Sequence, residues 1–247
     1  LLHESPDLSS IYTPIDLGFS DPFESYRMLR FALRRFEQVG GLARGGKHLY
    51  SSEWEPNWYS TRGIYQAETM NTILALQMIG QSEAAEPFRR AIDEDFYTGP
   101  SMGAIAHRVE SHGVTDFTDI TSMYVRTVVE GLFGIKSNAP DDHILLQPAF
   151  PLEWEHASIN SPAVAYAYTW GERSERLAIE TPQPRALTIR LRARSASIER
   201  VTVNGALAEY TVEPGIGYAY IVIKAAGSAV MGVEVAYGAD PLPVVET

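Results

Sequence analysis

Cysteine is absent from this chain of 247 residues. Its absence excludes disulfides, thiolate metal ligands and a cysteine nucleophile, and it removes the usual marker of redox compartment. Long apolar runs are absent as well, because the most apolar stretch, residues 215–239, is interrupted by Lys224 and Glu234. A membrane-spanning helix needs about 18 or more apolar residues in a row, so we expect neither such a helix nor a membrane partner.

Basic residues are few: 20 Lys and Arg stand against 31 Asp and Glu, which gives a net charge of −11. This charge repels phosphate backbones and anionic lipid, so nucleic acid is not an expected partner. The remaining composition is typical of a globular protein, with 45% hydrophobic and 11% aromatic residues. The first ten residues, LLHESPDLSS, contain no basic segment followed by an apolar one, so they do not form an intact signal peptide.

The common nucleotide, protease and calcium motifs are also missing. The sequence contains no GxGxxG, GxxxxGKS/T, HExxH or GxSxG pattern and no EF-hand loop. His107 and His112 are the closest pair of histidines, but a gap of five residues places two helical side chains on poorly matched faces. We therefore predict no metal ion and no cofactor.

The first part of the chain has the apolar spacing of helices. An N-terminal helix signal at residues 21–24 precedes apolar residues up to Phe36, and a glycine pair follows. Similar spacing predicts further helices at about residues 60–78, 82–96 and 118–133.

After Pro140 the apolar residues recur with the period of two that is typical of strands. Seven such runs are separated by turn residues, and the pair Asn204 and Gly205 is a strong hairpin signal. We predict an α+β protein of two domains, a helical domain at 1–140 and an antiparallel β-sandwich at 141–247.

Residues 50–62 combine aromatic rings with charged groups around a proline. Flat aromatic faces and carboxylate or guanidinium groups suit the C–H faces and hydroxyls of sugars. This pattern predicts a sugar-binding loop formed by Glu53, Trp54, Glu55, Trp58 and Arg62. The alternative is a loop whose tryptophans only pack on the helices.

Two further carboxylates, Asp116 and Asp119, lie at the start of the last predicted helix, after His107 and His112. Both carboxylates can be ordinary helix caps. Glycoside hydrolysis, however, needs one protonated and one ionised carboxyl on opposite sides of the scissile bond. Glu68 is a further candidate, because in the predicted helix it shares an otherwise small or apolar face.

A family resemblance is found at residues 118–154. The segment 118–135 ends in Gly134-Ile135, and residues 144–154 read ILLQPAFPLEW. Both resemble the end of the catalytic domain in six-hairpin (α/α)6-toroid glycoside hydrolases of the bacterial α-L-rhamnosidase and α-L-fucosidase kind, which a β-sandwich follows. Residues 201–205 are similar to a hairpin of that trailing domain.

The resemblance implies inverting hydrolysis of an oligo- or polysaccharide by two carboxyl groups, with Asp119 as the first candidate and Asp116 as the second. Glu53 and Glu68 are candidates from composition and helix face alone. Such toroids contain many more helices than the four predicted here. The chain is therefore expected to be the C-terminal part of a longer enzyme, or to pair with a second copy, and the resemblance favours a periplasmic or secreted location.

Two other functions fit the same residues. A polysaccharide lyase needs a Tyr or His base and a cationic or amide group that neutralises a uronate, and Asn57, Tyr59, Arg62 and His107 supply these types. A non-catalytic protein that binds glycans or has a structural role would retain the aromatic loop without turnover. Substituting Asp119 with Asn distinguishes catalysis from capping.

Overall fold

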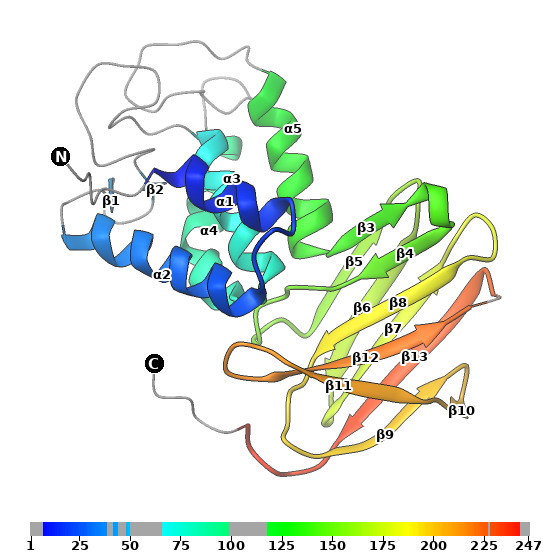
Figure 1. Cartoon of the computed structure of the whole chain (residues 1–247). Coiled ribbons are helices and arrows are strands. Elements are labelled where there is room, and N and C mark those ends of the chain that lie inside the picture. Colours follow the sequence, from blue (N-terminus) through cyan, green and yellow to red (C-terminus); the bar gives the residue numbers. More distant parts are fainter. Residues whose placement is uncertain are drawn as a thin grey trace. The chain divides into compact units, whose positions relative to one another are not determined.

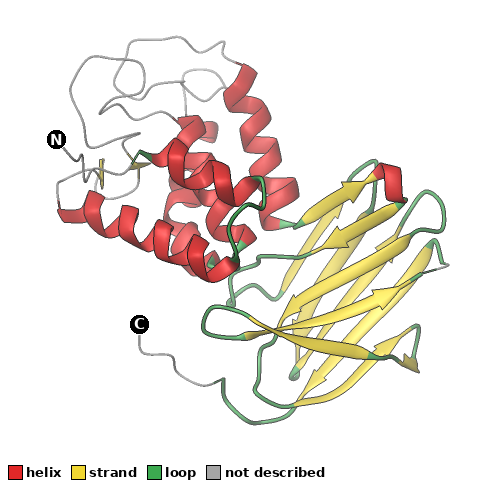
Figure 2. Cartoon of the chain, viewed as in Figure 1, coloured by secondary structure: helices red, strands yellow, loops and turns green. Residues whose placement is uncertain are grey.

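A computed structural model describes residues 7–38, 42–43, 48–49, 66–98, 118–226 and 228–242. The chain divides into two compact units, Leu1–Leu132 and Phe133–Thr247. The described elements of the first are mainly helices, and the second contains two sheets (Figures 1 and 2). The predicted α+β class is confirmed, whereas the domain boundary after residue 140 stays a prediction.

The helical unit contains five α-helices and a π-helical turn within the described ranges. These are α1 (Leu8–Asp16), α2 (Pro22–Gln38), α3 (Gln66–Met78), α4 (Ser82–Thr98), α5 (Thr118–Arg126) and η1 (Thr127–Leu132), with the short strands β1 (Leu42–Ala43) and β2 (His48–Leu49). None of these helices is long and apolar enough to cross a lipid bilayer.

Local sequence explains the start of α2. Asp21 Oδ1 accepts hydrogen bonds from the backbone amides of Phe23 and Glu24, both at 2.8 Å, and Glu24 reaches back to the amide of Asp21 at 3.4 Å. This reciprocal cap was expected from residues 21–24 and is confirmed.

Two differences from the expected helices have local causes. Helix α1 was not predicted, because it is short and contains Pro14. In the structure Asp7 caps it and its apolar side chains are buried. The helix expected at 118–133 is α-helical only to Arg126 and then becomes the π-helical turn η1. Gly131 lies there against α3, where an added Cβ would be only 2.1 Å from Gln77 Oε1.

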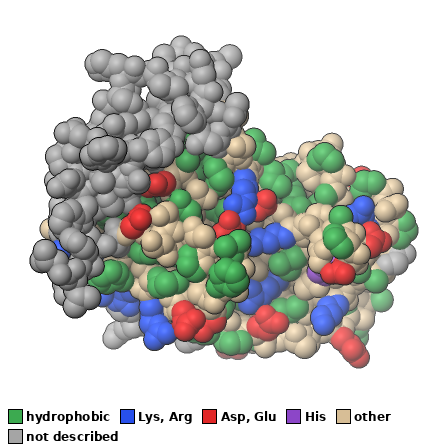
Figure 3. Space-filling model, turned by 45° about the horizontal axis from the view of Figure 1, so that its top comes forward, with side chains coloured by type: hydrophobic (Ala, Val, Ile, Leu, Met, Phe, Trp, Pro, Cys, Tyr) green, Lys and Arg blue, Asp and Glu red, His purple; other side chains and the backbone are tan. Residues whose placement is uncertain are grey.

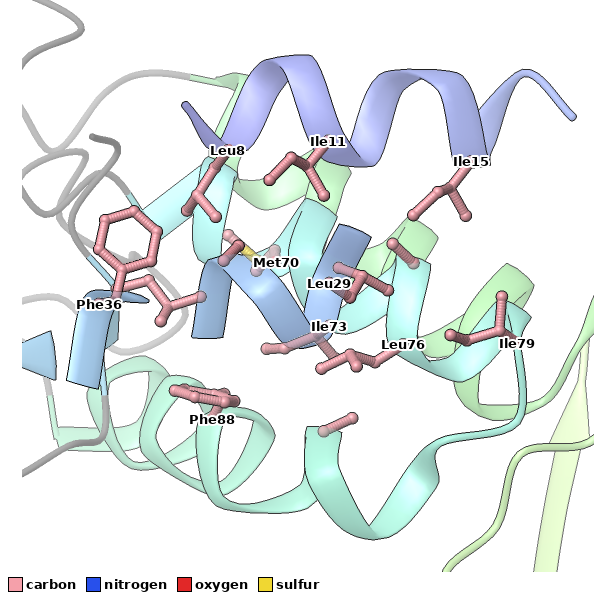
Figure 4. Close-up of a cluster of buried hydrophobic side chains, with 14 of the residues drawn as sticks. Leu8, Ile11, Ile15, Leu29, Phe36, Met70, Ile73, Leu76, Ile79 and Phe88 are labelled. Atoms are coloured by element: carbon pink, nitrogen blue, oxygen red, sulfur yellow. The ribbon is translucent and has the colours of Figure 1, made fainter. Parts of the chain in front are cut away.

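The core of the helical unit lies between α1, α2, α3 and α4. Figure 4 shows Leu8, Ile11 and Ile15 of α1 directed at the side of α3 that presents Met70. Helix α3 is buried on nearly all sides, including polar residues such as Gln66, Thr69 and Gln77. This burial makes α3 the central helix of the unit, so any charged group on it is placed among packed neighbours.

The second unit is a β-sandwich. Its six-stranded sheet has the order β10-β9-β13-β7-β6-β5 and its five-stranded sheet the order β11-β12-β8-β4-β3. The bounds are β3 (Ile135–Asn138), β4 (His143–Leu146), β5 (His156–Asn160), β6 (Ala165–Gly171), β7 (Ser174–Glu180), β8 (Ala186–Arg192), β9 (Ile198–Val203), β10 (Ala206–Leu207), β11 (Tyr210–Pro214), β12 (Ala219–Ala225) and β13 (Val230–Tyr237), with the 3₁₀ turn η2 (Ala139–Asp141).

Alternation along the strands builds the sandwich core. In β7, for example, Glu175, Leu177 and Ile179 are buried and the residues between them are not. The Asn204-Gly205 hairpin is confirmed, because both residues have positive φ, 51° and 78°, and join β9 to β10. The sheets are mainly antiparallel, as predicted. Within the described residues β4 pairs in parallel with β8, and β5, β6 and β7 of the other sheet lie between these two strands in the chain.

Candidate functional site

The structure describes few of the predicted site residues. Glu53, Trp54, Glu55, Trp58, Arg62, His107, His112 and Asp116 lie outside the described residues. Asp119 is the second residue of α5, and only its backbone belongs to the described part. Glu68 is the one predicted site residue whose side chain lies in the described part of the structure.

Glu68 lies in the first turn of α3. Its carboxylate oxygen Oε2 is buried and has no hydrogen-bond partner among the described residues. Two neighbouring polar side chains are tied to the helix itself: Asn71 donates to the Ala67 carbonyl at 3.0 Å, and Thr72 to the Glu68 carbonyl at 2.9 Å. Asn71 therefore donates to its own helix. Among the polar side chains of this turn, Glu68 is the one that can ionise and exchange a proton.

The pKa of Glu68 is raised to about 7 from its ordinary value of 4.5, first by burial and second by the negative charge of Asp7. Asp7 is held in place as the N-cap of α1, where its Oδ1 accepts hydrogen bonds from Ser9 N at 3.1 Å and Ser9 Oγ at 2.9 Å. A fixed anion beside a buried carboxyl favours the protonated form. Glu68 can thus keep its proton close to neutral pH.

Tyr12 of α1 completes this group. Its pKa is raised to about 12 by burial, by Glu68 and by Asp7, in that order, so the phenol remains a neutral donor at neutral pH. Neither Tyr12 nor Asp7 was predicted from the sequence. The signal was present, because an aspartate cap followed by apolar residues at positions 8, 11 and 15 has helical spacing.

A second buried carboxylate on α4 provides a contrast. Glu86 accepts hydrogen bonds from Arg89 and Arg90 at 2.7 Å each. Burial opposes ionisation of this group, but the hydrogen bonds from the two arginines outweigh it and lower the pKa of Glu86. Arg89 also pairs with Asp93, which accepts a hydrogen bond from Tyr124 of α5 at 2.9 Å. These charges are satisfied by one another, which is typical of a structural network.

The sandwich contains one further carboxyl with a raised pKa. Burial raises the pKa of Glu175 to about 7, but Tyr237 and Tyr168 both hydrogen-bond to it. Arg194 donates to Tyr168 Oη at 2.6 Å, and its guanidinium lies 4.5 Å from the ring centre of Trp170. Glu175 is enclosed by partners between the sheets, so it is a core group and not a candidate for catalysis.

Glu68 therefore differs in chemistry from Glu86 and Glu175. Its raised pKa lets it keep a proton near neutral pH, and its Oε2 has no hydrogen-bond partner among the described residues. Such a carboxyl can donate a proton to a bound oxygen atom. Within the described residues no group of three or more His, Asp or Glu side chains is arranged to hold a metal ion. On the face shown in Figure 3, acidic and basic side chains of the described residues are interspersed.

No family model and no curated protein sequence match this chain. Solved structures match its fold. An α-L-rhamnosidase from Dictyoglumus thermophilum is similar, with a TM-score of 0.58 and 14% identity over 94% of this chain and 25% of that chain. An α-L-rhamnosidase from Streptomyces avermitilis, in complex with L-rhamnose, is similar with a TM-score of 0.52 and 13% identity over 92% of this chain and 21% of that chain.

The chain spans about a quarter or less of the length of those two enzymes. At this identity the likeness concerns the fold, which resembles that of glycoside hydrolases and agrees with the resemblance seen at residues 118–154. The toroid and the identity of the catalytic residues stay predictions.

Proposed function

We propose that this chain forms part of the active site of a glycoside hydrolase and that Glu68 is the catalytic acid. The observation that carries this proposal is the partly buried Glu68 carboxyl, with a pKa of about 7 and a buried Oε2 that has no partner among the described residues. The likeness of the fold to two α-L-rhamnosidases supports the reaction class.

A catalytic acid must hold its proton at the working pH and give it to the glycosidic oxygen as the C–O bond breaks. In the inverting reaction, a second carboxylate accepts a proton from water as that water attacks the anomeric carbon from the opposite side of the ring. The two carboxyl groups then lie roughly 6.5–9.5 Å apart. We propose Asp119 as this base, with Asp116 and Glu53 as the next candidates.

The sugar itself needs apolar and polar contacts. Aromatic rings cover the C–H faces of a pyranose, and charged or amide groups bind its hydroxyls. We assign this role to the residues predicted from sequence: Trp54, Glu55, Trp58, Arg62, His107 and His112. The first substrates to test are α-L-rhamnosides, because both similar structures carry the name α-L-rhamnosidase.

The test compares two aryl α-L-rhamnosides, one with a poor phenol leaving group and one with a dinitrophenol that departs without protonation. In the full natural protein, Glu68→Gln is expected to lower kcat/KM for the poor leaving group about 10²–10⁴-fold, with little loss for the activated one. The wild-type rate should also fall as the pH rises through about 7. Asp119→Asn is expected to slow both substrates, because a base is needed for each.

Glu86→Gln is the matched control, since it removes a buried carboxylate of the same unit that is ion-paired. Equal loss on both rhamnosides after Glu68→Gln, or no loss on either, contradicts the role of Glu68. A product with a new conjugated double bond indicates a lyase instead and overturns the hydrolase proposal.

A further inference from the structure

The outer face of the six-stranded sheet carries a row of very small side chains. Ser158 of β5 pairs with Ala167 of β6, Ala167 with Ala178 of β7, and Ala178 with Gly232 of β13. The row therefore runs across four neighbouring strands, over a length of about 14 Å at the usual strand spacing of roughly 4.8 Å. Because all four residues are exposed and small, the row is a shallow trench in the surface.

Two hollows follow this trench. One has a volume of about 360 Å³ and the other of about 340 Å³, and both are lined by Ala167 and Ala178. They therefore join into a single depression, which we call the cross-strand groove. Its floor is the row from Ser158 to Gly232, and its first hollow extends to Asn204 in the β9–β10 turn.

Gly232 has no steric reason to be glycine. Its φ is not among the positive values, and an added Cβ would meet nothing closer than Asn204 Oδ1 at 3.9 Å. Glycine and alanine are poor strand formers, and glycine inside a strand lowers stability. A glycine in the interior of a strand often marks the close approach of a ligand. The hydrogen bonds of Gly232 to Asn204 use its backbone groups, which any residue could supply.

A second observation points to a ligand in the same place. Thr202 of β9 lines the groove and is only 8% exposed, yet none of the side-chain hydrogen bonds within the described ranges involves its hydroxyl. The hydroxyl of such a residue at the wall of a hollow can donate a hydrogen bond to a bound ligand and accept one from it.

The chemistry of the walls identifies the class of ligand. The hydroxyl and amide groups of Ser158, Asn160 and Thr169 line the groove together with both signs of charge. Arg176 lies 3.3 Å from Glu234, so these two charges largely compensate each other, and Glu180 at the second hollow adds a negative charge that disfavours an anionic ligand. The backbone groups beneath are used in strand pairing, so an extended peptide has no ladder to join on this face. Neutral molecules rich in hydroxyl groups fit such walls.

We propose that the cross-strand groove binds a neutral glycan chain, at a site on the sandwich that is separate from Glu68. The alanine methyl groups and Gly232 would contact the flat C–H faces of the sugar. The hydroxyls of Thr202 and Thr169 and the amide nitrogen of Asn204 line the position of the sugar hydroxyls, since Asn204 Oδ1 already accepts from the Gly232 amide at 2.8 Å. This site does not depend on the proposed hydrolase activity, because no residue of the helical unit contributes to it.

The test is affinity electrophoresis of the full natural protein in native gels that contain dextran, galactomannan, arabinan or polygalacturonate. At least one neutral polysaccharide is expected to retard the wild-type protein. Gly232→Thr fills the groove, and because threonine is a better strand former it should raise the melting temperature while weakening retardation at least tenfold. Thr202→Val, which removes only the hydroxyl, should weaken it several-fold.

Val230→Thr is the matched control, since Val230 is 66% exposed on the same face of the same strand and does not line either hollow. It should leave retardation unchanged, as should Glu68→Gln, which tests the hydrolase separately. The proposal is overturned if no neutral polysaccharide retards the protein, if only polygalacturonate does, or if Gly232→Thr leaves retardation intact. A lower melting temperature of Gly232→Thr also overturns it, because the glycine would then serve the fold.

Discussion

Replacing Glu68 with glutamine should stabilise the helical unit at high pH. The pKa of Glu68 is about 7 in the folded protein and 4.5 in its ordinary state. Since one pKa unit corresponds to about 1.4 kcal/mol, ionising this carboxyl in the folded protein costs ~3 kcal/mol more than in the unfolded chain. The glutamine still buries an unpaired polar oxygen, so we expect a net gain of roughly 1–3 kcal/mol.

The sign of the effect depends on pH. Below 4.5 the carboxyl is protonated in both states, so the wild-type protein retains its full stability and the substitution changes little. As the pH rises through about 7 the folded protein must ionise a buried group, and stability is lost. The difference between wild type and Glu68→Gln should therefore grow between these two values and then level off.

The assay is urea denaturation of both proteins across this pH range, followed by far-UV circular dichroism as a measure of helix. Glu175 produces a pH dependence of its own, but it is common to both proteins and cancels in the difference. Glu86→Gln is expected to lower stability at neutral pH, because it leaves Arg89 and Arg90 without their partner. A variant at Glu68 that is equally or less stable at about pH 8 would refute the burial argument.

Three other substitutions have definite expected outcomes. Glu175→Gln should abolish most of the loss of sandwich stability that occurs as the pH rises through about 7, measured by urea denaturation with tryptophan fluorescence. Arg126→Ala removes the bidentate pair with Asp16 at 2.5 and 2.8 Å and should cost about 1 kcal/mol at low salt and less at high salt; an effect independent of salt would contradict it. Gly134→Ala should lower stability by more than ~3 kcal/mol in thermal melts, because φ is 62° and the new Cβ would lie 1.8 Å from the Gln147 carbonyl oxygen; a melting temperature near that of wild type would show that the turn relaxes freely.

The sequence predicted those helices and turns whose ends depend on residues close by in the chain. The cap at Asp21 places the start of α2, and the Asn204-Gly205 pair specifies its hairpin through positive φ. The strands β3, β5 and β11 were not predicted. They are short, and every residue of β11 is exposed although its apolar and polar residues alternate. This strand is defined by its pairing with β12 and not by burial of one face.

The candidate site was predictable only in part. Glu68 was recognisable as a carboxyl among small and apolar residues of a helix. Its pKa, however, depends on Asp7, which lies 61 positions away in the chain and approaches only because α1 packs on α3. Asn71, three residues after Glu68 in the same helix, hydrogen-bonds to its own helix. The spacing of residues in a helix predicts which face a side chain lies on, but not the groups from other elements that it contacts.

The parallel pair of β4 and β8 has a consequence for the order of folding. β4 can pair on both sides only when residues 186–192 are available, after the chain has passed through β5, β6 and β7 in the other sheet. Contacts between distant segments form late and slow the search for the native state. During synthesis the β3–β4 hairpin must therefore wait, with β4 exposing an unpaired edge, until about forty further residues have left the ribosome.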